Sequence, residues 1–203
     1  MQCISHPHTA GSSCSTCATG SVIGGGYRHS AAILENGTVK AWGDNNYGQL
    51  GQGNTQDIGD GSNEMGDNLS AVDLGTGRTA TAIAVSYYHA MVILDNGTVK
   101  GWGYNGQGQL GQGNNTRIGD GSNEMGDNLE AIDLGTGRTA TAIAGGNFHT
   151  VALLDNGTVK AWGYNPQGQL GQGNTNNIGD GSNEMGDNLS PIDLSSSSDA
   201  TLE

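Results

Sequence analysis

NGTVKAWGDNNYGQLGQGN, residues 36–54, is the stretch that decides the fold, because it occurs three times. It returns as NGTVKGWGYNGQGQLGQGN at 96–114 and as NGTVKAWGYNPQGQLGQGN at 156–174. The twelve residues IGDGSNEMGDNL are identical at 58, 118 and 178, again 60 residues apart. Self-similarity at a fixed period is typical of repeat architectures. The sequence therefore predicts three copies of one structural unit.

The repeats divide the chain into units with clear boundaries. The predicted organisation is an N-terminal segment 1–19 outside the repeats, three blades at 20–79, 80–139 and 140–199, and a tail at 200–203. The 37 glycines recur at fixed places. We therefore expect a turn-rich repeat fold and not a glycine linker.

Each unit has the pattern of a small antiparallel sheet. TAIAVS (81–86) is short and apolar, and HAMVIL (89–94) is a continuous apolar run, typical of a strand covered on both faces. Asn96-Gly97 predicts a type I′ hairpin turn, after which TVKGW (98–102) is the return strand. AIDL (131–134) is a candidate fourth, edge strand.

Sheets of three or four strands cannot bury both faces alone. Stacking on identical sheets solves this, as in solenoids and propellers. No segment shows a sustained helical period, so we expect an all-β fold. The long loop at 51–70 accounts for the length of the period and should project from the blade.

A family resemblance follows from these residues. The pattern H-x-x-x-(I/L)-L-(D/E)-N-G-T-V-K-x-W-G-x-N-x-x-G-Q-L-G-x-G resembles the repeat of the regulator-of-chromosome-condensation family, over about 180 of the 203 residues. The GDGSNEMGDNL portion is similar to the bacterial branch of these repeats. The resemblance implies β-propeller blades, usually seven in a ring. It implies function only weakly, since some members are nucleotide exchange factors and others are bacterial inhibitors that bind through the propeller face.

Three blades are too few to close a ring, because propellers typically have about four to eight. An open stack leaves an apolar sheet face at each end, which marks an interface. We therefore expect a homo-oligomer, with a dimer of six blades favoured over a trimer of nine. A fragment, or an array capped by its own ends, is the alternative.

The charge of the chain limits its partners. The net charge is −13, which argues against nucleic acid and against an anionic membrane surface. No stretch is long and apolar enough to insert into a bilayer. Solubility explains the acidity; a basic partner or bound cations are the alternatives.

Positions that differ between the repeats are the candidates for partner binding. Short windows at strand ends change while the scaffold repeats, and binding residues favour such places. Tyrosine is enriched in interface hot spots. The predicted contact residues are Tyr27, Tyr47, Tyr87, Tyr88, Tyr104 and Tyr164. Drift between duplicated units, with the rings packing blades together, is the competing interpretation.

Two groups of residues have the ligand types of metal sites. Each long loop carries three carboxylates that could bind calcium, although the spacing is not that of an EF-hand; capping of loop turns is the favoured explanation. These carboxylates are Asp60, Glu64 and Asp67, then Asp120, Glu124 and Asp127, then Asp180, Glu184 and Asp187. The N-terminal segment offers Cys3, His6, Cys14 and Cys17 to zinc, with His8 beside them; a disulfide-linked or disordered tail is the alternative. We expect no bound cofactor, with calcium as the exception to test.

No catalytic constellation is present in the sequence. His29, His89 and His149 recur at one blade position, so we interpret them as structural and expect them to bond to neighbouring loops. GxSxG, HExxH and P-loop motifs do not occur. The prediction is a non-enzymatic protein-binding module, in a secreted or cell-surface setting rather than another compartment. A self-assembling ring protein and an inhibitor of a basic cleft are the alternatives.

Overall fold

The structure, a computed structural model, describes residues 20–195, which form three antiparallel sheets of three strands. The strands are β1 (Ile23–Gly25), β2 (His29–Ile33), β3 (Val39–Gly43), β4 (Ala80–Val85), β5 (His89–Leu94), β6 (Val99–Gly103), β7 (Ala140–Gly145), β8 (His149–Leu154) and β9 (Val159–Gly163). Three 3-10 turns, η1 (Gly66–Asn68), η2 (Gly126–Asn128) and η3 (Gly186–Asn188), lie in the long loops. The prediction of an all-β chain of propeller-type blades is confirmed.

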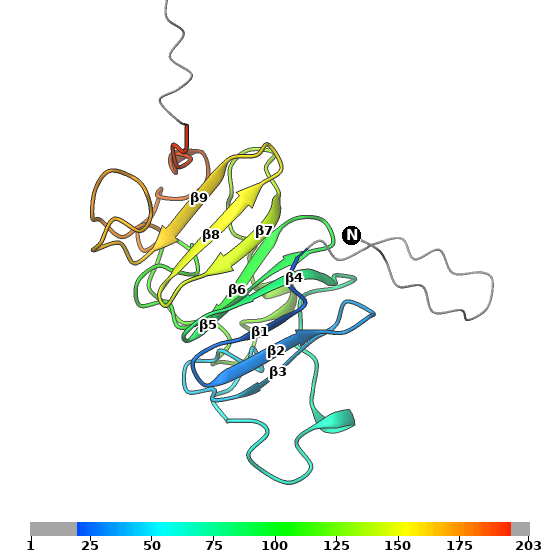
Figure 1. Cartoon of the computed structure of the whole chain (residues 1–203). Coiled ribbons are helices and arrows are strands. Elements are labelled where there is room, and N and C mark those ends of the chain that lie inside the picture. The colour runs from blue at the N-terminus through cyan, green and yellow to red at the C-terminus, as the bar shows by residue number, and fades with distance from the viewer. Residues whose placement is uncertain (1–19, 196–203) are drawn as a thin grey trace, which may run out of the picture.

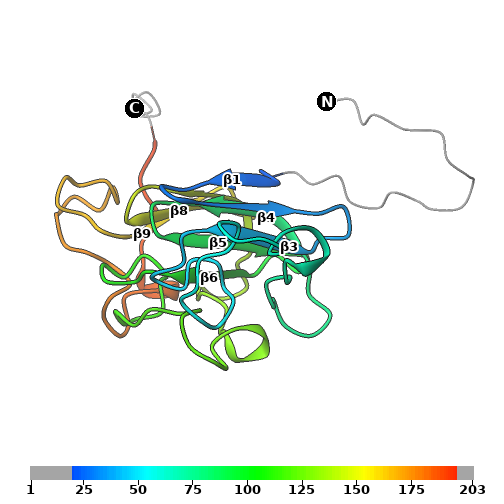
Figure 2. The same ribbon diagram turned by 90° about the horizontal axis from the view of Figure 1, so that it is seen from below.

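The sheets follow one another in space as they do in the chain. The sheet β4–β6 lies between the other two, with β4 contacting β1, β2 and β7 (Figures 1 and 2). The loop between β3 and β4 extends away from the sheets, as expected for the long part of the period (Figure 1). This stacking gives the middle sheet a neighbour on each face.

Burial follows from this order. Every residue of β5 is buried, as its continuous apolar run predicts, while β2 and β8 are partly exposed. One apolar core, which includes Trp102, lies between the first and second sheets, and another, which includes Trp162, lies between the second and third. The same sequence pattern is therefore covered on both faces only in the middle sheet.

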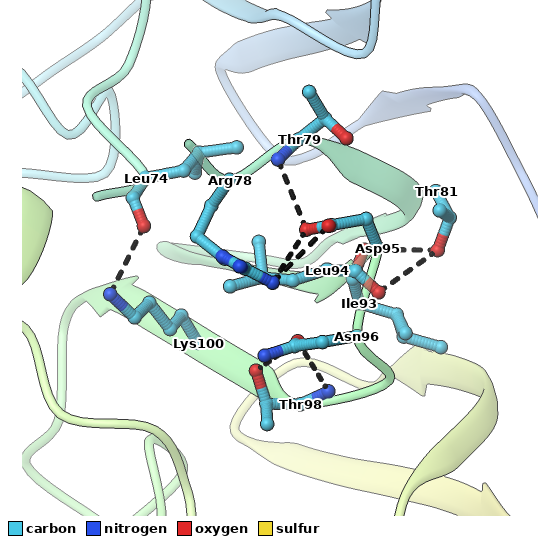
Figure 3. Close-up of polar contacts among 10 residues, drawn as sticks. All are labelled: Leu74, Arg78, Thr79, Thr81, Ile93, Leu94, Asp95, Asn96, Thr98 and Lys100. Atoms are coloured by element: carbon cyan, nitrogen blue, oxygen red, sulfur yellow. Dashed lines mark hydrogen bonds and ion pairs between the residues drawn. The ribbon is translucent and has the colours of Figure 1, made fainter. Parts of the chain in front are cut away.

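The hairpin turn differs from the predicted type I′ turn. Gly97 N–H donates to the Leu94 carbonyl at 2.9 Å, and Leu94 N–H donates to the Thr98 carbonyl at 2.9 Å. Gly97 has a φ of 79°, whereas Asn96 is not among the residues with positive φ. This is a three-residue loop of a type I turn followed by a glycine bulge. The Asn96 carboxamide oxygen instead accepts from Thr98 N–H at 3.1 Å (Figure 3).

The predicted fourth strand is also absent from the described residues. The segment 131–134 makes one ladder-like bond, from Ile132 N–H to the Val99 carbonyl at 2.8 Å. The Leu134 carbonyl accepts from the Lys160 ammonium of the next sheet, at 3.0 Å. Because this carbonyl is used between sheets, the segment joins two blades instead of extending one.

Candidate functional site

The variable windows of the sequence meet at one edge of the sheets. Within each sheet the outer strands run parallel to each other, because both are antiparallel to the central strand. The loop after the first strand and the segment after the third strand therefore end at the same edge. In the first sheet these are residues 26–28 and 44–48, and the other two sheets repeat the arrangement.

Aromatic side chains gather at this edge. All six predicted tyrosines lie together with one residue that the prediction did not include, Phe148. We call this set the aromatic surface: Tyr27, Tyr47, Tyr87, Tyr88, Tyr104, Phe148 and Tyr164. The rings come from all three sheets, so the surface exists only when the blades are stacked.

The rings form a continuous series of contacts across the blades. Tyr27 of the first sheet stacks on Tyr87 of the second, with centroids 4.3 Å apart and planes at 11°. Tyr87 lies 5.5 Å from Phe148 of the third sheet, and Phe148 lies 6.3 Å from Tyr164. Stacked and edge-to-face pairs at these distances are favourable. The rings therefore hold one another in place before any partner arrives.

The two ends of the aromatic surface are open to solvent. Tyr27 is 50% exposed and Tyr164 is 36% exposed, while the rings between them are half-buried. The Arg28 guanidinium lies 5.0 Å from the Tyr27 ring centre, and that of Arg117 lies 5.7 Å from the Tyr47 ring centre. Arg28, Arg117 and Phe148 all fall in the variable windows, which was the signal that could have identified them.

The carboxylates of the long loops bind their own backbone. The Glu124 carboxylate accepts from Gly119 N–H and Gly121 N–H, both at 2.8 Å, and Glu64 and Glu184 do the same in their loops. These N–H donors hold the pKa of Glu64 below its ordinary value, with the Gly61 bond the largest cause. Loop capping therefore uses the oxygens that a cation would need.

Three aspartates of the long loops also bind other groups of the protein. Asp127 accepts from Thr76 N–H at 2.8 Å and from the Thr76 hydroxyl at 2.6 Å, and Asp120 pairs with Arg117 at 3.5 Å. Asp187 repeats the bonds of Asp127 with Thr136. Between residues 20 and 195 no three histidine, cysteine or acidic side chains are arranged to hold a metal ion. The calcium hypothesis therefore has no support in these loops, whereas the zinc candidates Cys3, His6, Cys14 and Cys17 lie outside the described residues.

Two of the recurring histidines, His29 and His89, are buried inside the stack, whereas His149 is half-buried. His89 Nε2 lies 3.3 Å from the hydroxyl of Thr150, a strand residue of the next sheet, so the expected bond to a loop is wrong there. Neither ring nitrogen of His29 has a hydrogen-bond partner among the described residues. Burial lowers the pKa of His29 to about 4 and that of His89 to about 3. Both rings are therefore neutral at pH 7.

Comparison with known proteins identifies the repeat. The regulator of chromosome condensation (RCC1) repeat matches at residues 22–49, 80–109 and 140–169. The chain is 30% identical over 155 residues to the human E3 ubiquitin-protein ligase HERC2, covering 76% of this chain and 3% of that protein. It is 28% identical over 155 residues to the Arabidopsis thaliana ultraviolet-B receptor UVR8, covering 75% of this chain and 31% of the receptor.

A solved structure has the same fold. Prp20p from Saccharomyces cerevisiae, a yeast RCC1, superposes with a TM-score of 0.60 at 20% identity, over 87% of this chain and 39% of that chain. The chain thus spans well under half the length of each of these relatives. Among residues 20–195 no helix has the length and apolarity that crossing a membrane requires. Because the family's repeat matches all three units of the sequence, the chain belongs to the regulator of chromosome condensation repeat family.

Proposed function

We propose that the protein is a non-enzymatic protein-binding module that contacts its partner through the aromatic surface. The observation that carries the proposal is the gathering of seven rings from three blades at one edge, with Tyr27 and Tyr164 exposed at its ends. Preassembled aromatic rings offer large contact area and lose little side-chain freedom on binding. Repeat-to-repeat variation at these positions supports a recognition role, because nearby segments such as NGTVK and GQLGQGN are identical in all three repeats.

The comparisons agree with a protein partner but do not name one. Prp20p is described with binding properties to Gsp1p and histones. The present chain covers 39% of that structure and 3% of HERC2, so neither those partners nor ligase activity is carried over. The proposal therefore rests on the surface of this chain.

The test compares the full chain with a variant of the two most exposed rings, Tyr27→Ser with Tyr164→Ser. Proteins enriched by the wild type are purified and titrated against each chain by calorimetry. We expect a partner whose Kd rises at least about tenfold in the double variant, as for the loss of hot-spot rings. Val22→Ser is the matched control, because Val22 is a comparably exposed apolar residue outside the aromatic surface. Equal affinity of wild type and double variant for every purified candidate contradicts the proposal.

Two further functions have observations of their own. The net charge of −13 favours an inhibitor of a basic cleft, whose binding would weaken as salt screens the charges. The apolar faces that the first and third sheets leave uncovered favour self-assembly into a closed ring. Of these two functions, self-assembly has the more detailed structural support.

A further inference from the structure

We infer that the outer faces of the first and third sheets bind each other between two copies of this chain, head to tail. This inference deepens the self-assembly proposal and does not depend on the aromatic surface. The chain already contains the same junction twice, between the first and second sheets and between the second and third. Each element of that junction recurs, unpaired, at the two ends of the stack.

A tryptophan bond fixes the internal junctions. Trp102 Nε1–H donates to the Gln49 carbonyl of the preceding sheet at 3.1 Å, and Trp162 Nε1–H donates to the Gln109 carbonyl at 3.0 Å. Trp42 is the counterpart in the first sheet, half-buried and without an acceptor among residues 20–195. Gln169 carries the counterpart carbonyl in the third sheet. One end therefore has the donor and the other end has the acceptor.

A lysine side chain makes a second hydrogen bond between neighbouring blades, and its counterpart at the end of the stack lacks it. The Lys100 ammonium donates to the Leu74 carbonyl of the preceding blade at 3.0 Å and to the Gly126 carbonyl of its own loop at 2.8 Å (Figure 3 shows the first). Within residues 20–195, the Lys40 ammonium makes only the bond within its own loop, to the Gly66 carbonyl at 2.9 Å. Leu194 occupies the position of Leu74 at the far end of the stack. Lys40 therefore lacks the partner that Leu194 would supply.

A hydroxyl group adds specificity to the pairing. Thr150 donates to the Gln109 carbonyl at 2.9 Å and lies against His89, whereas the equivalent position in the second sheet is Ala90. The first sheet has a hydroxyl at this position, Ser30, which pairs with Trp42 in the strand register. In a head-to-tail pair, Ser30 would meet His149 and Gln169 as Thr150 meets His89 and Gln109.

The apolar side chains show how much surface the junction covers. Ile23 is 70% exposed, while its counterpart Ile83, which faces the first sheet, is 2% exposed. Leu194 is 72% exposed, while its counterpart Leu134 is 3% exposed. Leu34 and Trp42 flank Ile23 on one end face, and Leu153 and Ile192 lie with Leu194 on the other. A second copy is the occupant that matches both the apolar area and the order of donors and acceptors.

Two such junctions are identical under a twofold axis, so a pair of chains places six blades in a closed arrangement. The first test is the mass of the full wild-type chain in solution, by light scattering at micromolar concentration. We expect at least twice the chain mass of 20.7 kDa, with three copies also satisfying a head-to-tail closure. A monomer at that concentration overturns the inference.

Variants of the two end faces test the polarity of the junction. Ile23→Lys damages the face of the first sheet, and Leu153→Glu damages that of the third. We expect each variant alone to be a monomer, and an equimolar mixture to form dimers, because one undamaged junction remains between them. An interface between like faces predicts the reverse, since one variant would still dimerise alone. Glu130→Ser is the control and should leave the mass unchanged, because Glu130 is exposed in the middle blade at a position where the other two repeats carry serine.

A third measurement, tryptophan fluorescence, follows assembly in the wild-type chain. Trp102 and Trp162 are fully buried in one chain, so only Trp42 changes its surroundings on assembly. We expect the tryptophan emission to shift to longer wavelength on dilution, and the shift to disappear in Trp42→Phe. A concentration-independent spectrum of the wild type, together with a monomer mass, contradicts the junction. A monomeric Ile23→Lys variant that keeps its affinity for the partner separates this inference from the main proposed function.

Discussion

At the scale of single residues, two buried histidines link the stability of the fold to pH. The His29 and His89 rings are neutral in the fold because burial makes their charged forms unfavourable. His29 also lies near the carboxylate of Asp44, which opposes the lowering, and His89 lies between His29 and His149, which add to it. The stack thus buries the His29 and His89 rings, whereas His149 is only half-buried.

We predict that acid destabilises the fold through these rings. Their folded pKa values of about 4 and about 3 lie below the ordinary value of 6.5, so the unfolded chain binds protons first. Stability is therefore full above pH 6.5 and is lost as the pH falls toward 4, by about 2 kcal/mol for each histidine at pH 5. Chemical denaturation from pH 7.5 to 5 measures this loss. His89→Gln should reduce the slope, and an unchanged slope would contradict the assignment.

At the residue scale, the six predicted contact tyrosines lie close to one another in the structure. These tyrosines were identified from the residue type and from their position in windows that vary between repeats, without any distances. Phe148 was passed over because phenylalanine carries no hot-spot preference of the tyrosine kind, yet its ring links Tyr87, Tyr104 and Tyr164. Whether these residues bind a partner stays a prediction.

Among the elements, the hairpins show how local sequence determines structure. Strand positions followed from apolar runs and β-branched residues, because these preferences act between neighbours in the chain. The turn was wrong in type, since Asn-Gly fits both a type I′ turn and the bulge that the structure has. Gly97 has a positive φ in either case, and the structure closes a three-residue loop because Leu94 N–H bonds to the Thr98 carbonyl.

We predict that glycine-to-alanine changes in equivalent hairpins have unequal costs. Gly97 and Gly157 have φ of 79° and 82°, so alanine pays a similar backbone strain of about 1 kcal/mol at both. A Cβ at Gly97 would also lie 2.7 Å from the Thr139 Cβ, whereas no described atom lies within 4 Å at Gly157. Gly97→Ala should therefore cost about 1–3 kcal/mol more than Gly157→Ala. Urea unfolding of both variants gives the difference, and equal costs would rule out the contact.

The whole molecule carries a large excess of negative charge. The chain has twenty acidic and seven basic residues. Within residues 20–195 three ion pairs form. Such an imbalance destabilises the compact state through repulsion. The long loops reduce it locally, because their glutamates accept backbone N–H groups.

We predict that modest salt stabilises the protein. Raising sodium chloride from low to physiological concentration screens the repulsion and should raise Tm by a few degrees, about 2–4 °C for a chain of this size. Scanning calorimetry at pH 7.5 measures the shift at one protein concentration, so that assembly does not vary. A Tm that falls with salt would show that attractive pairs dominate.

The sequence alone determined the repeat, the β class and the family, because period, apolar runs and turn residues are short-range features written in each unit. It also placed the variable positions at strand ends. Only the tertiary structure decided that the windows of three blades converge on one aromatic surface, since blade order and stacking set those distances. Only the tertiary structure distinguished equivalent residues: Ile23 and Ile83 occupy the same place in their repeats, yet Ile23 is exposed and Ile83 is buried because a neighbouring sheet covers it.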